Sequence, residues 1–415
     1  MASSSSTTTT TTTTTPRIAI VGAGPGGLVL ARLLHLASIP FVLYEAEPSR
    51  NSREQGGSLD LHEESGQLAL QAAGLYSEWK EIARSEGEDM RVADKHGKLF
   101  MEEVDIGGRN RPEVDRIQLR GLLLDSLPEG AIQWGHKVRS ISPSSNGNGK
   151  HEIHLRTTSN TRTETFDLVV GADGAWSKVR PLLSDTKPHY STISCLDTRI
   201  RSVDTLHPAI SKLVGQGIYL AFSDKKGLVG QRNGDGSIRT YIMLQKPETW
   251  LKDVGVDWSD AIATKKYMLE EEYKDWDDEF KSLITHANPD IVARPFYMLP
   301  TDFSWTSRQG LTLLGDAAHL MTPFAGEGVN LAMVDALDLS KAIVKASAED
   351  EKTELFDAIK DFETTMLERS HEKMEETWRN LELLFKPDAP REFVQAFEEM
   401  MAAHGPPPEL PKGYS

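Results

Sequence analysis

A glycine-rich turn close to the N-terminus constrains the fold more than any other feature of this chain. Residues 22–27 read Gly-Ala-Gly-Pro-Gly-Gly and lie between a short apolar run, residues 18–21, and a stretch with helical apolar spacing. We expect Gly22 to permit a tight turn, Gly24 to let the backbone approach a pyrophosphate, and Gly27 to let the helix pack closely on the strand. The start of such a helix offers free N–H groups and a partial positive charge to that anion. The spacing therefore predicts a βαβ unit that binds a nucleotide.

An acid at the end of the second strand of this unit, residues 41–44, supports the same interpretation. Glu45 stands 21 residues after Gly24, where a carboxylate can accept hydrogen bonds from an adenosine ribose. The pattern is compatible with either FAD or NAD. It disfavours NADP at this position, because a carboxylate would repel a 2′-phosphate.

Charge and composition exclude several other classes. The 415 residues include 46 Lys and Arg against 62 Asp and Glu, a net charge of −16, and no long basic block. A nucleic-acid partner is therefore not expected. Cys195 is the only cysteine, which excludes an internal disulfide and Cys-based metal sites. We interpret it as a small buried apolar residue and expect no metal.

The N-terminal segment and the apolar runs bear on localisation. Residues 1–15 are nearly all Ser and Thr, which predicts a disordered tail and not a signal peptide. No uninterrupted apolar run reaches the roughly 18 residues that a membrane-spanning helix needs. We therefore expect a cytoplasmic protein without a transmembrane segment, as a monomer or homodimer.

The order of strand and helix patterns predicts a mixed α/β (α+β) fold with a discontinuous organisation. A hairpin is expected over 92–100, four short strands of an antiparallel sheet between 191 and 300, a helical segment over 258–286, and long helices over 329–346 and 352–385. The predicted division is a tail, 1–15; a nucleotide-binding domain, 16–190 and 301–346, with part of 55–110 able to join the other side; a substrate domain, 191–300; and a C-terminal helix and tail, 347–415. The long C-terminal helix is expected to pack across both domains.

Two later segments repeat the strand-then-turn arrangement and point to a flavin. Residues 311–330 carry a buried strand, an acid after a strand-end glycine, a loop with Gly326 and Gly328, and a helix; residues 167–180 carry another strand and turn. We expect Asp316 to hold a ribityl hydroxyl and the loop glycines to let the backbone lie flat against a planar ring. The helix dipole points at the ring edge where reduction places negative charge, an interaction worth about 0.3–2 kcal/mol.

In this order, the segments resemble the para-hydroxybenzoate hydroxylase superfamily of FAD-dependent aromatic hydroxylases (class A). They are closer still to the tetracycline-inactivating flavin monooxygenases. The likeness is carried further by G-G-S-L-D-L-H at 56–62, P-E-V-D-R-I-Q-L-R at 112–120 and F-A-G-E-G-V-N at 324–330. It implies a Rossmann-like FAD-binding domain, an interleaved antiparallel-sheet substrate domain and a long C-terminal helix.

The resemblance also implies site residues. Asp60, Arg116 and Asp316 would contact FAD, and Arg53 would assist NADPH. The predicted cofactor-binding residues are Gly22, Gly24, Gly27, Glu45, Asp60, Arg116, Asp316, Gly326, Gly328 and Asn330. The candidates for the substrate pocket are Asp197, Tyr219, Phe222, Met243 and Phe324. We interpret His62 and His319 as structural and assign no catalytic residue.

Four positions depart from the pattern of these relatives. Thr322 stands where they often have Pro, and Glu327 where they often have Gln. A carboxylate beside the flavin would disfavour an anionic reduced ring unless it is protonated or points away. Asp197 and Tyr219 stand where tetracycline-binding relatives carry Gln and Arg, so the likeness does not extend to tetracycline as substrate.

The resemblance implies an FAD-dependent monooxygenase that uses NADPH (or NADH) and O2 to hydroxylate an aromatic, polyketide-like or other electron-rich small molecule through a flavin 4a-hydroperoxide. A single G-x-G-x-x-G motif predicts no dedicated second nucleotide domain. The alternatives are another FAD-dependent oxidoreductase, such as a dehydrogenase or reductase, and a non-catalytic flavin- or ligand-binding protein. An NAD-dependent dehydrogenase would use the first motif alone. A flavin halogenase would carry W-x-W-x-I-P, a pattern missing from this sequence.

Overall fold

The computed structural model describes residues 16–52, 56–103, 110–145, 147, 149–157, 160–348 and 354–404. The expected disordered tail, the end of the chain after residue 404, and Arg53 lie outside these residues. No helix within the described part of the chain combines the length and apolar character needed to cross a membrane.

The first layer is a five-stranded, all-parallel sheet in the order β17-β11-β1-β2-β7. Its strands are β1 (Ile18–Val21), β2 (Phe41–Tyr44), β7 (Ile132–Gln133), β11 (Leu168–Gly171) and β17 (Leu311–Leu313). The central strands are apolar along their whole length because both faces of a parallel sheet are covered. With β1 in the middle, the carboxyl ends of β1, β11 and β17 meet at one edge, where such sheets bind ligands.

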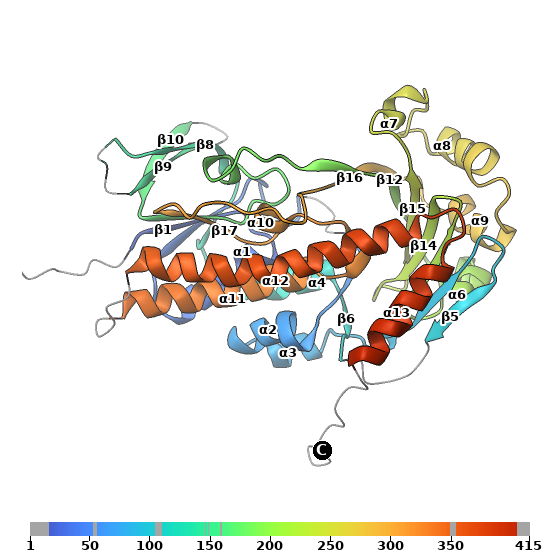
Figure 1. Cartoon of the computed structure of the whole chain (residues 1–415), viewed down its shortest axis with the longest axis horizontal. Helices are drawn as coiled ribbons and strands as arrows, with labels where there is room; N and C mark the ends of the chain where they lie inside the picture. The colour runs from blue at the N-terminus through green and yellow to red at the C-terminus, as the bar shows by residue number, and fades with distance from the viewer. Residues whose placement is uncertain are drawn as a thin grey trace, which may run out of the picture.

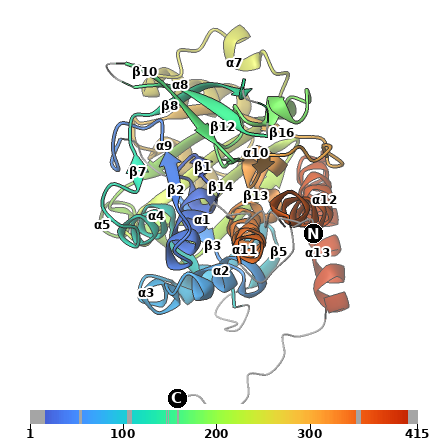
Figure 2. The same ribbon diagram turned by 90° about the vertical axis from the view of Figure 1, so that its left-hand side faces the viewer.

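Helices cover one face of this sheet and a small antiparallel sheet lies on the other side (Figure 2). The helices are α1 (Pro25–Leu36), α4 (Arg116–Asp125), α11 (Gly328–Ser347) and α12 (Leu355–Leu384), with the short α2 (Leu68–Ala72), α3 (Tyr76–Lys80) and α10 (Asp316–His319). The small sheet consists of β8 (Lys137–Pro143), β9 (His151–Arg156) and β10 (Thr161–Phe166). Helix α1 packs tightly on α11: a β-carbon at Gly26 would lie 2.7 Å from the carbonyl oxygen of Ala332.

The second layer is a seven-stranded sheet in the order β16-β12-β15-β14-β13-β4-β5. Its strands are β4 (Met90–Ala93), β5 (Leu99–Glu103), β12 (His189–Ile200), β13 (Ile218–Ser223), β14 (Lys226–Arg232), β15 (Ile238–Gln245) and β16 (Val292–Met298). The predicted hairpin forms β4 and β5, and β4 joins the sheet by parallel pairing with β13. The four strands that the sequence predicts at 196–200, 218–222, 227–231 and 239–244 are present. Strand β12 is longer than the first of these, and β16 was not predicted.

The helical segment expected over residues 258–286 is interrupted. It consists of α8 (Ala261–Tyr267), a π-helical turn (Met268–Glu272) and α9 (Asp278–Thr285). The break occurs because Tyr273 turns into the core, where its hydroxyl donates to the carbonyl oxygens of Gly227 and Met243 at 3.0 and 2.9 Å. The helix then restarts at Asp277, whose side chain accepts a hydrogen bond from the Glu279 amide. The remaining helices are α5 (Val203–Leu206), α6 (Pro208–Val214), α7 (Trp250–Asp253) and α13 (Arg391–His404).

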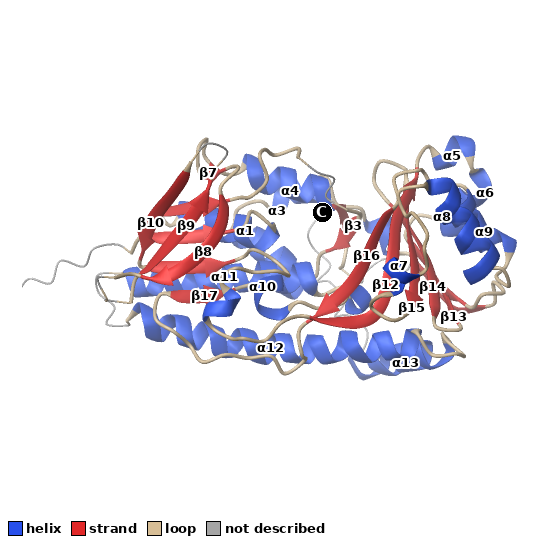
Figure 3. Ribbon diagram, turned by 90° about the horizontal axis from the view of Figure 1, so that it is seen from above, coloured by secondary structure: helices blue, strands red, loops and turns tan. Residues whose placement is uncertain are grey.

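Helix α12 joins the two layers, as the sequence predicted (Figures 1 and 3). Near its start, Phe362 and Met366 are buried in the core of the parallel sheet. Near its end, Leu381 and Leu384 are buried in an apolar cluster with the seven-stranded sheet. A single helix thereby fixes the separation between the two sheets.

Candidate functional site

The glycine turn has the predicted geometry. Gly22 adopts a φ of +107°, a conformation that favours glycine, and its amide donates to Tyr44 O at 2.8 Å. A β-carbon at Gly27 would lie 2.1 Å from Gly22 O, so only glycine allows this approach of helix and strand. Helix α1 begins at Pro25, after Gly24, and has no acid in its first turn. The helix start therefore presents its positive end without a carboxylate from its own first turn.

Glu45 lies against this turn. Its carboxylate accepts hydrogen bonds from the amides of Ala23 and Glu47, both at 2.8 Å. Each carboxylate oxygen has more than one acceptor position, so these two bonds orient the group and leave capacity for a hydroxyl. The ribose contact itself stays a prediction.

The three strand-end motifs meet beside the turn. The Ala172 amide donates to Val21 O at 2.9 Å, and the Leu314 amide donates to Gly171 O at 3.0 Å. Arg180 links the motifs, because its guanidinium donates to Ala175 O at 2.6 Å and to Ala317 O at 3.1 Å. Segments that are far apart in the sequence thus form one edge.

Asp316 begins α10 at this edge. The residue is exposed to solvent, yet burial raises the pKa of its carboxyl. The carboxyl group is thus surrounded by many protein atoms and is still accessible to a ligand. This is a suitable place for a carboxylate that holds a ligand hydroxyl.

A buried ion-pair network supports the backbone just before Asp316. Asp335 accepts from the Gly315 amide at 3.0 Å, from His319 Nε2 at 2.6 Å and from Arg369 at 2.9 Å. Despite its burial, neighbouring His319 and Arg369 lower the pKa of Asp335, and Asp335 raises that of His319. His319 faces Asp335 within the core, in keeping with the structural role expected for it.

A two-stranded ribbon, β3 (Ser58–Asp60) with β6 (Glu113–Asp115), brings the next motifs together. Asp60 is the cross-strand partner of Glu113. Arg116 begins α4 directly after β6, and its amide donates to Gly57 O at 3.1 Å. Asp60 therefore ends one strand of the ribbon and Arg116 directly follows the other, although the two residues lie far apart in the sequence.

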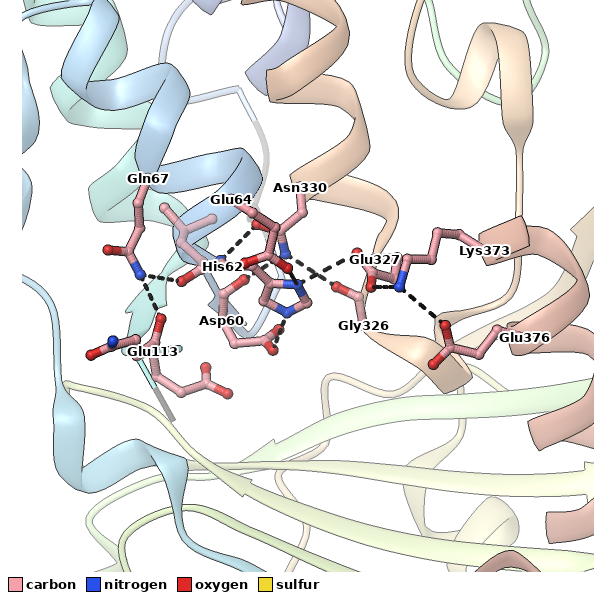
Figure 4. A network of polar contacts seen from close by, with 12 residues as sticks. Asp60, His62, Glu64, Gln67, Glu113, Gly326, Glu327, Asn330, Lys373 and Glu376 are labelled. Carbon is pink, nitrogen blue, oxygen red and sulfur yellow. Dashed lines mark hydrogen bonds and ion pairs between the residues drawn. The ribbon is translucent and has the colours of Figure 1, made fainter. Parts of the chain in front are cut away.

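Asn330 ties this ribbon to the start of α11 (Figure 4). It is fully buried. Its side-chain oxygen accepts from the His62 amide at 2.9 Å, and its side-chain nitrogen donates to Asp60 O at 3.0 Å. The amide side chain thus binds protein backbone, and a contact of Asn330 with the cofactor stays a prediction.

Glu327 is ionised and points away from the loop backbone toward two cations (Figure 4). Its carboxylate lies 2.8 Å from Lys373 Nζ and 3.5 Å from His62 Nδ1. Although burial opposes it, these neighbours lower the pKa of Glu327 to about 2. The carboxylate is therefore ionised and paired with cations, and its orientation relative to a bound flavin stays a prediction.

His62 is fully buried and holds the other end of this cluster. Its Nε2 lies 2.9 Å from Asp60 Oδ2. Burial disfavours the imidazolium, but Asp60 and Glu327 raise the pKa of His62 to about 9. At neutral pH this histidine is therefore a cation between two carboxylates.

Helix α12 holds the loop that precedes α11. The hydroxyl of Thr377 donates to Thr322 O at 2.8 Å, and the side-chain amide of Asn380 donates to Phe324 O at 3.0 Å. Thr322, which departs from the family pattern, is buried in this contact. The loop with Gly326 and Gly328 is thus fixed from the side of the C-terminal helix.

An aromatic wall stands between this loop and the seven-stranded sheet. We use this name for four phenylalanines and one methionine that share one apolar cluster: Phe222, Phe296, Phe324, Phe385 and Met243. The Phe385 ring lies 5.5 Å from those of both Phe222 and Phe324, and Phe296 lies 6.3 Å from Phe324. Three of the predicted substrate-pocket residues, Phe222, Met243 and Phe324, therefore come together.

The prediction for Tyr219 was wrong. This side chain packs on the opposite face of the sheet, 5.3 Å from the Phe280 ring in the other apolar cluster. Successive residues of a strand point to opposite faces, so Tyr219 and Phe222 of β13 cannot share one. Asp197 is buried in an ion pair, with Arg239 at 2.7 Å and Arg294 at 3.1 Å, which limits its capacity to bind a substrate.

The sequence analysis missed a polar group beside the wall. Gln231 Nε2 donates to Glu113 Oε1 at 3.4 Å, while Glu113 Oε2 is buried without a hydrogen bond. Burial and the nearby charge of Asp60 raise the pKa of Glu113 to about 8. A β-carbon on Gly57 would lie 2.7 Å from the Tyr241 hydroxyl. The signals in the sequence were the alternation along β14, which carries Gln231, and the motif that contains Glu113.

The residues fit an FAD molecule. Gly24 and Gly328 have open space where a side chain would begin, as close approach of a ligand to the backbone requires. Asp173 Oδ1 is buried without a hydrogen bond. Among the described residues, no group of His, Cys, Asp or Glu is placed to hold a metal ion, and Cys195 is buried as expected.

The fold and the site together define a class of two-sheet flavoproteins. In this class a parallel sheet binds the nucleotide, glycine turns and acids converge beside it, and a second sheet closes the site with an aromatic wall. The family model described as "FAD binding domain" matches residues 15–369. The chain belongs to this family, within the para-hydroxybenzoate hydroxylase superfamily of FAD-dependent monooxygenases.

Curated relatives and solved structures agree with this assignment. The chain is 32% identical to "Monooxygenase penA" of Penicillium thymicola, over 92% of this chain and 98% of the relative. It is also 32% identical to "Monooxygenase asqM" of Emericella nidulans, over 90% and 96%. The fold resembles Klebsiella pneumoniae HpxO complexed with FAD and uric acid, with a TM-score of 0.75 and 18% identity over 94% of both chains. Tetracycline destructase Tet(55) gives a TM-score of 0.70 at 18% identity, over 94% and 95%.

Proposed function

We propose that this protein takes electrons from NADPH or NADH and uses O2 to hydroxylate an aromatic, polyketide-like or other electron-rich small molecule. The observation that carries the proposal is the position of Phe324. It belongs both to the loop expected to contact the flavin ring and to the aromatic wall. A substrate that packs on this wall would lie beside the cofactor loop.

FAD, when bound, supplies the redox chemistry by taking up electrons from the nicotinamide and activating O2. The chain's own residues bind and orient it. The glycine turn and the start of α1 would receive the pyrophosphate, Glu45 the ribose, and Asp316 the ribityl chain. Asp60, Arg116 and the loop glycines would hold the flavin end.

The wall and its surroundings supply orientation and exclusion of water. Apolar side chains keep water from the reacting atoms, which prevents loss of reactive species to side reactions. The neutral Glu113 carboxyl, beside Gln231, can donate a hydrogen bond to a polar group of the substrate. We expect the substrate to have an apolar ring system with at least one polar substituent.

The reductant is expected to bind transiently, because the sequence has a single G-x-G-x-x-G motif. Arg53 is the residue proposed to assist it. A substitution of Arg53 with Ala should slow flavin reduction by NADPH and leave the amount of bound FAD unchanged. Arg50→Ala is the matched control, because Arg50 forms an ion pair with the exposed residue Asp125. This variant should leave the rate of flavin reduction unchanged. Equal reduction rates in both variants would remove Arg53 from the proposal.

Purification and an absorbance spectrum come first in testing the function, since bound FAD makes the protein yellow. NADPH and NADH oxidation is then measured with a panel of phenols and polyketides under isotopically labelled O2. We expect a ligand that accelerates oxidation of the nicotinamide and a product that carries one labelled oxygen. Flavin without accelerated oxidation would indicate a ligand-binding protein, and an unlabelled product would indicate a dehydrogenase or reductase.

The cofactor site is tested separately. Asp316→Ala should yield protein without FAD, because the ribityl contact is lost. Asp302→Ala, at an exposed acid in a preceding loop, should retain a full complement. Full flavin content in the Asp316 variant would overturn the placement of the cofactor.

A further inference from the structure

A partly buried row of alternating charges runs through Glu327 of the cofactor loop (Figure 4). Asp60 pairs with His62 at 2.9 Å, His62 lies 3.5 Å from Glu327, and Glu327 pairs with Lys373 at 2.8 Å. Glu327 is 6% exposed and Lys373 29% exposed. Glu376, on the same helix, lies 3.2 Å from Lys373.

The four groups from Asp60 to Lys373 carry two positive and two negative charges, and two further carboxylates lie beside them: Glu376 next to Lys373, and Glu64 at 3.9 Å from His62 Nδ1. Burial opposes charge on His62 and Lys373, but their carboxylate neighbours raise the pKa of both groups. Two cations therefore face two carboxylates, Asp60 and Glu327. If Lys373 were neutral, at least one negative charge would stay uncompensated next to the loop expected to contact the flavin ring.

That charge matters because reduction of the flavin adds negative charge to the ring edge that faces the start of α11. A like charge nearby disfavours an anionic form. The effect is large in a partly buried site, where the effective dielectric constant is far below that of water. The Glu327 carboxylate is therefore compatible with reduction only when a cation compensates it.

We propose that Lys373 is a positioning residue that sets the redox potential of bound FAD by neutralising Glu327 of the cofactor loop. The proposal rests on the cofactor placement in the proposed function. Lys373 belongs to α12 and lies beyond residue 369, where the match to the family model ends. The compensating charge thus comes from outside the matched region, and it accompanies a carboxylate where relatives often have Gln.

A purely structural role for the pair is less consistent with its surroundings. Thr377 and Asn380 already attach α12 to the same loop through neutral hydrogen bonds to the backbone. A buried ion pair repays its desolvation poorly compared with such bonds. A role in attachment alone would therefore not require charges here.

The test is an anaerobic titration of bound FAD against a reference dye, in holoprotein reconstituted with FAD. Lys373→Met removes the charge and keeps most of the side chain. We expect the equilibrium constant for reduction of bound FAD to fall at least tenfold, which lowers the redox potential of this two-electron couple by about 30 mV. Glu327→Gln alone should raise the potential, and the double variant should return close to the wild-type value.

Lys341→Met serves as the matched control, because Lys341 is an exposed lysine that pairs with Asp338 on α11, and we expect no shift. A wild-type potential in Lys373→Met, or a double variant that stays as low as Lys373→Met, would overturn the proposal. If Lys373→Met does not fold, Lys373→Gln is titrated in its place with the same criteria. The titration needs neither nicotinamide, substrate nor O2, so it gives its answer even if the proposed hydroxylation fails.

Discussion

The buried carboxylate of Asp335 offers the sharpest test of how this fold supports its site. Asp335 accepts three charged or backbone hydrogen bonds, from the Gly315 amide, His319 and Arg369, and it is fully buried. In Asp335→Asn the side chain has one acceptor oxygen in place of two. Its NH2 group must then face one of the three donors.

The magnitude follows from burial. Breaking one side of a buried, hydrogen-bonded ion pair costs about 3–5 kcal/mol, because the remaining charges stay uncompensated. Asp338→Asn is a matched control on the same helix. Asp338 pairs with the same Arg369 at 2.9 Å, but its side chain is 29% exposed, so the loss should be about 0–1 kcal/mol.

The assay is denaturant unfolding of the apoprotein at neutral pH, followed by circular dichroism, so that cofactor binding does not add to stability. We expect the Asp335 variant to unfold at a clearly lower denaturant concentration than the Asp338 variant. Because the pKa of Asp335 is lowered from its usual 3.8, the difference from wild type should shrink as the pH falls below that value. Equal losses in the two variants would refute the view that this network holds the strand-end turn.

Two further predictions concern the polar and aromatic sides of the pocket. The pKa of Glu113 is about 8 in the folded protein, against an ordinary value of 4.5. Between these pH values the folded protein keeps the Glu113 proton and the unfolded chain releases it, so the free energy of unfolding of the wild type falls as pH rises from 4.5 to 8. In Glu113→Gln this loss of stability should disappear. Relative to wild type, the variant should gain at least about 1.4 kcal/mol in the free energy of unfolding between pH 4.5 and pH 8, the equivalent of one pKa unit. Unfolding curves that keep the wild-type pH dependence would contradict this prediction. Phe385→Ala should cost about 3–5 kcal/mol, because Phe385 is 3% exposed and contacts Phe222 and Phe324. Leu206→Ala, at a site that is 68% exposed, should cost less than about 0.5 kcal/mol, and thermal unfolding of both variants checks the contrast.

The sequence by itself determined the features that depend on local geometry. A positive φ at Gly22 and the contact between Gly27 and the preceding strand follow from spacing alone, because each involves residues within one turn. The hairpin of β4 and β5 was predictable for the same reason. The order of the motifs also sufficed to identify the family.

Tertiary structure decided which side chains share a space. Tyr219 and Phe222 are three residues apart on one strand, and only the placement of the sheet shows which of them faces the aromatic wall. For Glu327 the sequence left the protonation state open, and the ionised form is stabilised by His62 and Lys373, which lie far from it along the chain. The physical reason is common to both cases: strand alternation and glycine spacing are local rules, whereas the partner of a buried charge or ring is set by how distant segments pack.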